Sequence, residues 1–155
     1  MTRTGWTGCK RLLIVEPDEA RSVHLRDTLG ELADIDRDAD FHAARAHLFS
    51  KPYDWLVTNV RIGAFNGLHL VHLIGASQLP VRSLVYADQL DLCLARQAQR
   101  AGAFYESGDC VNRALPAYLR GALPLQDRRN LAPDRRAAFR GSRRCVDSST
   151  AAAVA

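Results

Sequence analysis

The residues best placed to do chemistry lie within residues 53–67, YDWLVTNVRIGAFNG. An apolar run ends there in Thr58 and Asn59, and an irregular loop and a helical pattern follow. Open parallel sheets bind ligands at the carboxyl ends of their strands, so Asn59 occupies the position that decides the chemistry. An amide donates and accepts hydrogen bonds, but it cannot act as a carboxylate nucleophile or bind a divalent cation strongly.

The remaining candidate groups do not complete an active site. Glu16, Asp18 and Asn59 are the polar groups at predicted strand ends, and together they lack the base and nucleophile that an enzyme requires. His69 and His72 are three positions apart without a third ligand of suitable spacing, so we expect no metal site. The glycines at 63 and 67 do not match a nucleotide-binding loop. We therefore expect a protein that is not an enzyme.

Short apolar strands alternate with amphipathic helices, a pattern typical of a parallel sheet covered on both faces. We expect strands at residues 11–16, near 35, and at 55–59, 81–86 and 103–105. Helices are expected at residues 18–32, 40–49, 67–74, 88–100 and 111–123. Asp18 is predicted to cap the first of them. The predicted fold class is α/β, a doubly wound, five-stranded parallel sheet of the flavodoxin-like kind.

The 155 residues suffice for one domain with an ordinary core. We expect an N-terminal extension at residues 1–9, a globular domain at 10–123 and a tail at 124–155. No apolar run approaches the roughly 18 residues that suggest a membrane helix, so no membrane association is expected. The four cysteines are widely separated, which fits reduced thiols in a cytoplasmic protein: Cys9, Cys93, Cys110 and Cys145.

The tail carries the whole net charge of +4, because basic and acidic residues cancel in residues 1–123. Its composition predicts disorder in isolation. One interpretation is a solvated extension that aids solubility, and the other is contact with an acidic protein or with nucleic-acid phosphates. The cations concerned are seven arginines: Arg128, Arg129, Arg135, Arg136, Arg140, Arg143 and Arg144.

Four segments, in order, resemble the receiver domain of bacterial response regulators: LLIVEPDEA, YDWLVTN, GAFNGLHLVHLI and PVRSLVYA. The first resembles a strand that ends in an acidic pair, and the second a strand that ends in the phosphoacceptor aspartate. The third resembles the loop motif P-x-x-[DN]-G, and the fourth a strand that ends in Thr or Ser followed by Ala. The likeness spans about residues 10–122 and implies the receiver fold.

The same resemblance implies a phosphoacceptor pocket that has lost most of its reactive groups. Asn59 stands at the nucleophile position, and Glu16-Pro17 replaces the acid pair, with Asp18 as a displaced substitute. Tyr86 stands where the family has a small hydroxyl residue. Receiver chemistry depends on Mg²⁺ held by hard oxygen ligands, and these residues make a poor set. We expect weak or absent Mg²⁺ binding and no other cofactor.

The lysine that pairs with the phosphoryl group in the family is also missing. Its position falls at Ser107, and no lysine follows Lys51, so the conclusion does not depend on the alignment. The resemblance therefore indicates a degenerate receiver, a pseudo-receiver, in which phosphorylation at the usual site is absent.

The resemblance also implies function through protein contact within a two-component phosphorelay. In receivers the fourth helix, fifth strand and fifth helix usually form the partner face. Its residues here would be Tyr86, Phe104, Tyr105, Leu115 and Tyr118. The expected partner is a sensor kinase or another regulator, and a homodimer is also compatible. The alternative is a nucleic-acid-associated accessory protein that binds phosphate through its tail.

Overall fold

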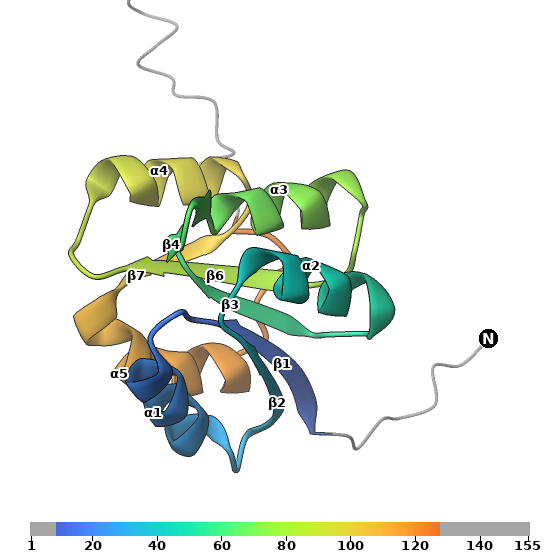
Figure 1. Ribbon diagram of the computed structural model, residues 1–155, viewed down its shortest axis with the longest axis vertical. Coiled ribbons are helices and arrows are strands. Elements are labelled where there is room, and N and C mark those ends of the chain that lie inside the picture. Colours follow the sequence, from blue (N-terminus) through green and yellow to red (C-terminus); the bar gives the residue numbers. More distant parts are fainter. Residues whose placement is uncertain (1–8, 128–155) are drawn as a thin grey trace, which may run out of the picture.

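A five-stranded, fully parallel sheet forms the centre of the computed structural model, which describes residues 9–127 (Figure 1). The strand order is β2-β1-β3-β6-β7, so the chain runs outward to one edge from β1 and then crosses to the other. The strands are β1 (Lys10–Val15), β2 (Ala33–Asp38), β3 (Trp55–Asn59), β6 (Arg82–Ala87) and β7 (Phe104–Ser107).

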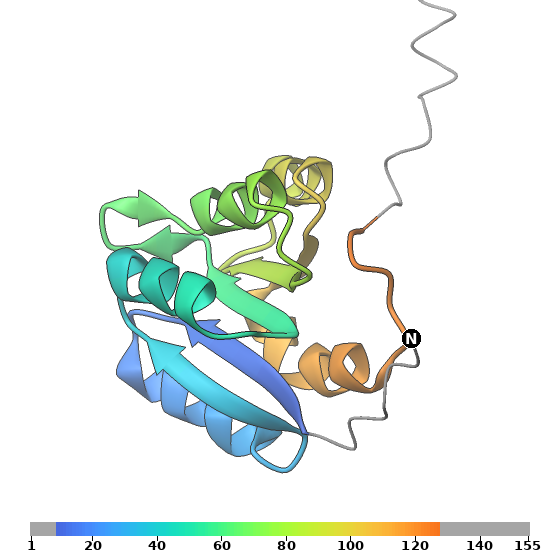
Figure 2. The ribbon, with the colours of Figure 1, turned by 90° about the vertical axis from the view of Figure 1, so that its right-hand side faces the viewer.

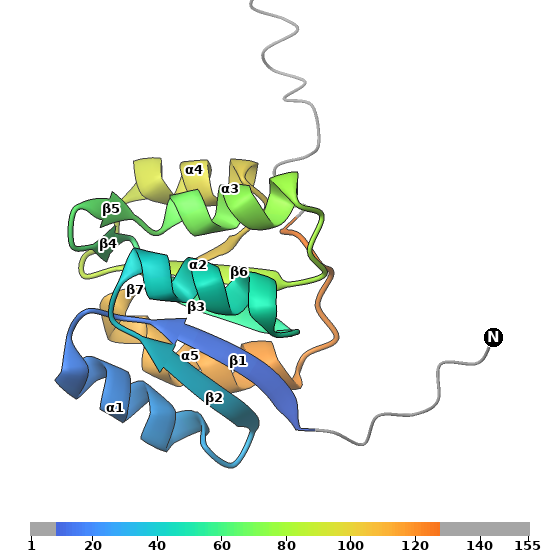
Figure 3. The same ribbon diagram turned by 45° about the vertical axis from the view of Figure 1, so that its right-hand side comes forward.

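Helices cover both faces of this sheet (Figure 3). One layer contains α1 (Glu19–Leu29) and α5 (Gly108–Arg120). The other contains α2 (Phe41–Ser50), α3 (Leu68–Ala76) and α4 (Leu92–Arg100). The alternation along β1 explains the arrangement, because Leu12 and Ile14 pack in the core shared with α1 and α5, whereas Leu13 and Val15 pack in the core shared with α2 and α3.

Three helices begin at an aspartate that caps free backbone N–H groups. Asp18 accepts from Ala20 and Arg21, and Asp40 caps α2 in the same way. Asp91 accepts from the N–H groups of Cys93 and Leu94 at 2.8 and 3.2 Å. The helix predicted from residue 88 therefore begins only after this cap, and residues 88–91 form a loop instead.

The other predicted elements are observed with small shifts at their ends. The fifth strand runs to Ser107, so α5 begins at Gly108 and ends at Arg120, about one turn earlier than predicted. The irregular loop predicted after Asn59 contains a small antiparallel hairpin, β4 (Arg61–Ile62) and β5 (Phe65–Asn66). Gly63 supplies the positive φ of +58° at its turn.

The folded part continues past the boundary predicted at residue 123. Arg82 Nε donates to the carbonyl of Leu123 at 2.9 Å, and the N–H of Asp127 donates to the carbonyl of Gly102 at 3.0 Å. Asp127 is buried. The N-terminal extension up to residue 8 and the seven arginines of the tail lie outside the described residues. None of the described helices is long and apolar enough to cross a membrane.

Candidate functional site

The predicted pocket residues come from the carboxyl ends of four neighbouring strands. Glu16 follows β1, Asn59 ends β3 and is in register with Tyr86 of β6, and Ser107 ends β7. Parallel strands present these ends at one edge of the sheet, as the sequence analysis assumed. Three of the side chains, those of Glu16, Asn59 and Tyr86, make direct contact.

Glu16 is the centre of this cluster and is 3% exposed. Its Oε1 accepts the backbone N–H of Asp18 at 2.9 Å. Its Oε2 accepts the amide of Asn59 at 3.0 Å and the hydroxyl of Tyr86. Both carboxylate oxygens are therefore engaged by donors of the protein itself, as a buried charge requires.

The amide at position 59 has its own role in the cluster. Asn59 Nδ2 donates to Glu16, and Asn59 Oδ1 accepts the N–H of Arg61 at 3.0 Å. An aspartate could accept from Arg61 but, when ionised, could donate nothing to Glu16. The residue that removes the nucleophile thus also stabilises the neighbouring carboxylate.

Tyr86 is fully buried, and its ring belongs to the core between the sheet and the α1–α5 layer. Burial, reinforced by the negative charge of Glu16 and the hydrogen bond to it, raises the pKa of the Tyr86 phenol well above its usual value. The phenol therefore stays protonated and acts as a donor. A residue fixed in this way does not swing toward a small anion.

Two charged residues of the site were missed by the sequence analysis. Arg21 Nη1 lies 3.9 Å from Glu16 Oε2 and also forms an ion pair with Asp88. The hydrogen bond to Asp88, opposed by partial burial, raises the pKa of Arg21. Asp88 directly follows β6, so the strand-end rule could have identified it. Nothing in the sequence indicates that α1 directs Arg21 to the same place.

The other predicted pocket residues take different roles. Asp18 is exposed and its carboxylate caps α1, so it does not substitute for the missing acid. Pro17 is exposed, and Ser107 precedes α5 without a side-chain capping hydrogen bond. No group of three or more His, Cys, Asp or Glu side chains within residues 9–127 could hold a metal ion. The residues present do not fit Mg²⁺, because the donors around Glu16 take the place of a cation.

Gly67 fixes the loop that follows the site. A Cβ atom there would clash with the carbonyl oxygen of Asn59 and would lie 2.7 Å from Thr58 Oγ1. The N–H of Gly67 donates to the carbonyl of Val60 at 2.9 Å, and Asn66 Oδ1 accepts the N–H of Leu68. The Asn-Gly pair therefore lets α3 begin directly against the end of β3.

The predicted partner face is mostly interior. Tyr86, Phe104 and Leu115 are at most 5% exposed and belong to the core under α1 and α5. Tyr105 is 8% exposed, and its hydroxyl is held by the backbone of Gln89 and Asp91. Of the five, only Tyr118 is half-buried. As an exposed contact surface this prediction is wrong, because these apolar side chains point inward from β6, β7 and α5.

The surface next to the site is instead apolar at the loop before α4. Leu90 and Leu92 are 68% and 65% exposed. They line a cavity of about 610 Å³ that also reaches Asn59, Arg61 and Asp88. Exposed leucines beside a cavity are typical of a protein contact site.

No model of a known protein family and no curated protein matches the sequence. Solved structures do match. The chain is similar to a CheY-like receiver domain protein from Methanospirillum hungatei JF-1, at 17% identity and a TM-score of 0.67, over 73% of this chain and 92% of that one. CheY4 of Vibrio cholerae is 17% identical with a TM-score of 0.67, over 75% and 100%.

The NtrC4 receiver domain, in its beryllofluoride-activated dimer, is 19% identical with a TM-score of 0.63, over 69% of this chain and 91% of that one. Identities this low establish the fold. The chain has the fold of response regulator receiver domains, which confirms the predicted fold class and the resemblance on which it was based.

Proposed function

We propose that this protein is a receiver-type regulator of two-component signalling that acts by contact with another protein, without phosphorylation at the usual position. In this proposal it is cytoplasmic and catalyses no reaction of its own. Its partner is a sensor kinase or another regulator, and self-association into a homodimer is part of the same class of contact.

The observation that carries the proposal is the saturation of Glu16. Its two oxygens receive Asn59, Tyr86 and the N–H of Asp18, and Arg21 lies beside it. Phosphoryl transfer to a carboxylate needs a nucleophile, a cation and a clamp for the developing charge. Asn59 supplies no nucleophile, and the cluster has no oxygen to spare for a metal ion.

This arrangement supports a single fixed state of the site. A ligand shifts an equilibrium only by as much as it discriminates between two states. The buried phenol of Tyr86 is held by Glu16, so the phosphate-driven movement that resemblance to receivers would suggest has no mobile group here. A partner protein would therefore meet one preformed surface.

The contact surface that we propose lies at Leu90 and Leu92. These side chains are exposed, adjoin Asn59 across the cavity, and are offered by a loop rather than by a helix face. An apolar side chain of the partner, inserted between them and α4, would bury both leucines. Each would contribute about 1.5–3 kcal/mol on full burial.

The absence of phosphorylation is tested by incubation with Mg²⁺ and acetyl phosphate, followed by intact mass measurement. We expect no adduct, whereas a receiver that retains its aspartate, treated in parallel, should gain one phosphoryl group. A stable adduct on this chain, at any carboxylate of the site, would overturn the proposal.

The contact surface is tested by capture of partners with the full chain and identification of the bound protein. The affinity of that protein is then measured for the double variant Leu90→Ser, Leu92→Ser. A loss of ten-fold or more is expected, because each lost leucine removes apolar burial. Phe49→Ser, an equally exposed apolar residue on α2, is the control and should bind normally. Equal affinities for all three proteins would contradict the assignment.

A further inference from the structure

The two helical layers differ in charge. The helices α2, α3 and α4 contain no aspartate or glutamate, whereas α1 and α5 contain Glu19, Asp27 and Asp109. The arginines of the acid-free layer are Arg45, Arg96 and Arg100, all exposed. None of them forms an ion pair with any residue within 9–127, so their charge is available to a ligand.

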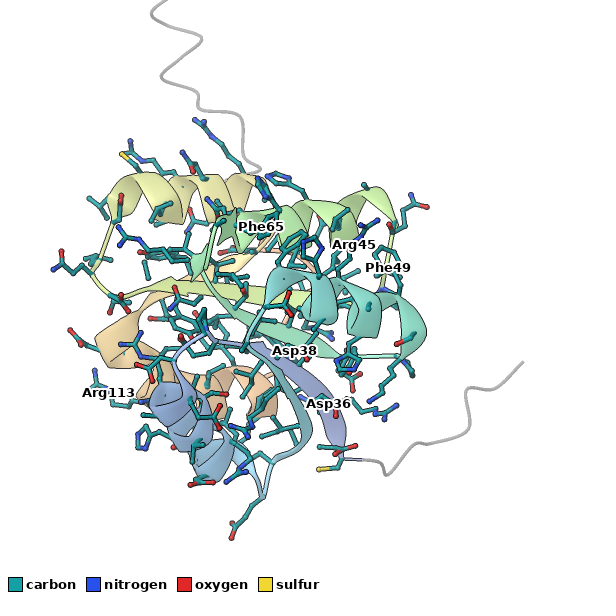
Figure 4. The ribbon with its side chains drawn as sticks, in the orientation of Figure 1. Asp36, Asp38, Arg45, Phe49, Phe65 and Arg113 are labelled. Atoms are coloured by element: carbon teal, nitrogen blue, oxygen red, sulfur yellow. The ribbon has the colours of Figure 1, made fainter. Side chains whose placement is uncertain are left out.

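These arginines lie on outward stripes of the layer. His42, Arg45 and Phe49 are spaced i, i+3 and i+7 on α2, and all are exposed. Arg96 and Arg100 are spaced i, i+4 on α4, and His69 and His72 are exposed on α3 between them. Figure 4 shows Arg45, Phe49 and Phe65 on this layer and Arg113 on the opposite one.

Exposed aromatic rings accompany the positive charge. Phe49 is 51% exposed and Phe65 is 38% exposed. The ring of Phe65 stacks on Phe41, with centroids 4.7 Å apart, and the ring of His42 meets its edge at 5.0 Å. Phe65 is thus held in place while one side stays open to solvent. Fixed rings beside arginines are the usual elements of single-strand binding surfaces, because bases stack on the rings and phosphates pair with the cations.

The route of the C-terminal segment adds to this surface. After α5, residues 121–127 cross the amino edge of the sheet and reach Gly102, at the end of α4 (Figure 2). The hydrogen bond from Asp127 to Gly102 holds the chain there, two residues from Arg100. The sequence then continues into the seven arginines of residues 128–144. The arginine-rich part of the chain therefore starts beside the acid-free layer and not beside α5, where the last helix ends.

We propose that the outer surface of α2, α3 and α4, together with the arginines that follow residue 127, binds single-stranded nucleic acid, either RNA or DNA. An acidic protein would use the arginines but gain little from Phe49 and Phe65 on the same surface. The guanidinium fork also matches phosphate oxygens in geometry as well as charge. This binding site is separate from the phosphorylation pocket and goes beyond the protein-contact function, so each proposal can fail alone.

The test uses the full chain and fluorescently labelled oligonucleotides of about 20 nucleotides, oligo(U) and oligo(dT), with anisotropy measured across a series of salt concentrations. We expect binding that weakens steeply with salt, because each neutralised phosphate of a single strand contributes about 0.7 to the slope of log K against log salt. The two oligonucleotides distinguish RNA from DNA.

The decisive variant is Arg45→Gln, Arg96→Gln, Arg100→Gln. If all three arginines contact phosphates, the slope falls by about 2 and the affinity falls roughly 100-fold at about 0.1 M salt. The matched control is Arg26→Gln, Arg113→Gln, Arg120→Gln, which removes the same charge from exposed positions of the α1–α5 layer. The control should change the affinity by about two-fold at most, since those residues face away from the proposed site.

Phe49→Ala separates stacking from charge. It should weaken binding about five-fold or more while leaving the salt slope unchanged. Thermal unfolding checks that each variant keeps the fold. Failure of the full chain to bind either oligonucleotide at about 50 mM salt would overturn the proposal. Equal losses in the two triple variants, or competition by poly-glutamate as strong as by oligonucleotide at equal charge, would also overturn it.

Discussion

Tyr86 and Tyr53 each donate a hydrogen bond to a carboxylate, but the two pairs lie in opposite surroundings. Tyr86 and its acceptor Glu16 are both buried at the carboxyl edge of the sheet. Tyr53 donates to Asp36 at 2.6 Å, and the Asp36 side chain is 34% exposed and also receives Lys51 at 3.0 Å. The same pair of groups is thus a sealed unit at one place and a surface contact at the other.

The comparison teaches that surroundings, more than the groups themselves, decide what such a pair does. Water can replace a lost partner of Asp36, so that pair contributes modestly to stability. Glu16 has no access to water, so every donor around it is needed. The degenerate pocket is therefore held closed by the cost of opening it, which is why we treat it as a fixed structural unit.

Asn59→Asp should break the sealed pair most severely. Two carboxylates in contact cannot both ionise, so either the introduced aspartate or Glu16 must stay protonated at pH 7. Holding a carboxyl group neutral about three pH units above its ordinary pKa costs about 4 kcal/mol of unfolding free energy. The pKa of the new pair is raised in the folded state, so the cost shrinks by about 1.4 kcal/mol per pH unit as the pH falls toward 4.

Urea unfolding at pH 7 and pH 5 measures this effect. Asn66→Asp is the control, because Asn66 uses only its Oδ1 oxygen as an acceptor from Leu68, which a carboxylate also provides. It should change stability by about 0.5 kcal/mol or less. Similar losses in both variants would show that position 59 is not special.

Tyr86→Phe should cost about 2 kcal/mol, the usual value for a hydrogen bond to a charged group. The ring remains in the core, so the loss reports the hydroxyl alone. Urea unfolding at pH 7 gives the value, and circular dichroism checks that the fold is kept. A loss as small as the one expected below for Tyr53→Phe would mean that Glu16 finds another donor.

The same hydroxyl should produce a dependence on alkaline pH. The pKa of Tyr86 is raised in the folded state above its ordinary value of about 10, so its contribution is complete below pH 10 and is lost as the pH rises further. The unfolding free energy of the native protein should therefore fall more steeply than that of Tyr86→Phe, by at most about 1.4 kcal/mol per pH unit. Equal slopes between pH 9 and 11.5 would contradict this.

Tyr53→Phe should have the smallest effect, about 0.5–1 kcal/mol at pH 7, because Lys51 and water still reach Asp36. The hydrogen bond from Tyr53, with help from Lys51, lowers the pKa of Asp36 below its ordinary value of 3.8. That contribution is present above pH 4 and disappears as the pH falls through the lowered pKa. The difference between variant and native protein should vanish near pH 2 in urea unfolding.

Much of this fold could be predicted from the sequence because its signals are local. Alternating burial along residues 12–15 and the breaks at Pro52 and Pro80 define the elements without tertiary information. The strand-end rule likewise placed Glu16, Asn59 and Tyr86 together. The capping power of Asp91 was also visible, but the apolar residues before it favoured an earlier helix start.

The failures concern direction rather than position. Phe104 lies on β7 and Leu115 on α5, as predicted, but both point into the core. The apolar spacing of Val111, Leu115 and Leu119 on α5 already indicated a buried stripe. The Arg21–Asp88 ion pair joins groups 67 positions apart, and only the packing of α1 beside β6 brings them together.

The aspartates that begin α1, α2 and α4 all lie where strands pass into helices, at the same edge as Glu16. Elsewhere such helix starts attract phosphate, since their free N–H groups and dipoles present partial positive charge. Here Asp18, Asp40 and Asp91 consume those N–H groups and add negative charge. An anionic phosphodonor approaching this rim would be repelled before it reached Asn59, so the pocket is guarded by electrostatics as well as by its missing nucleophile.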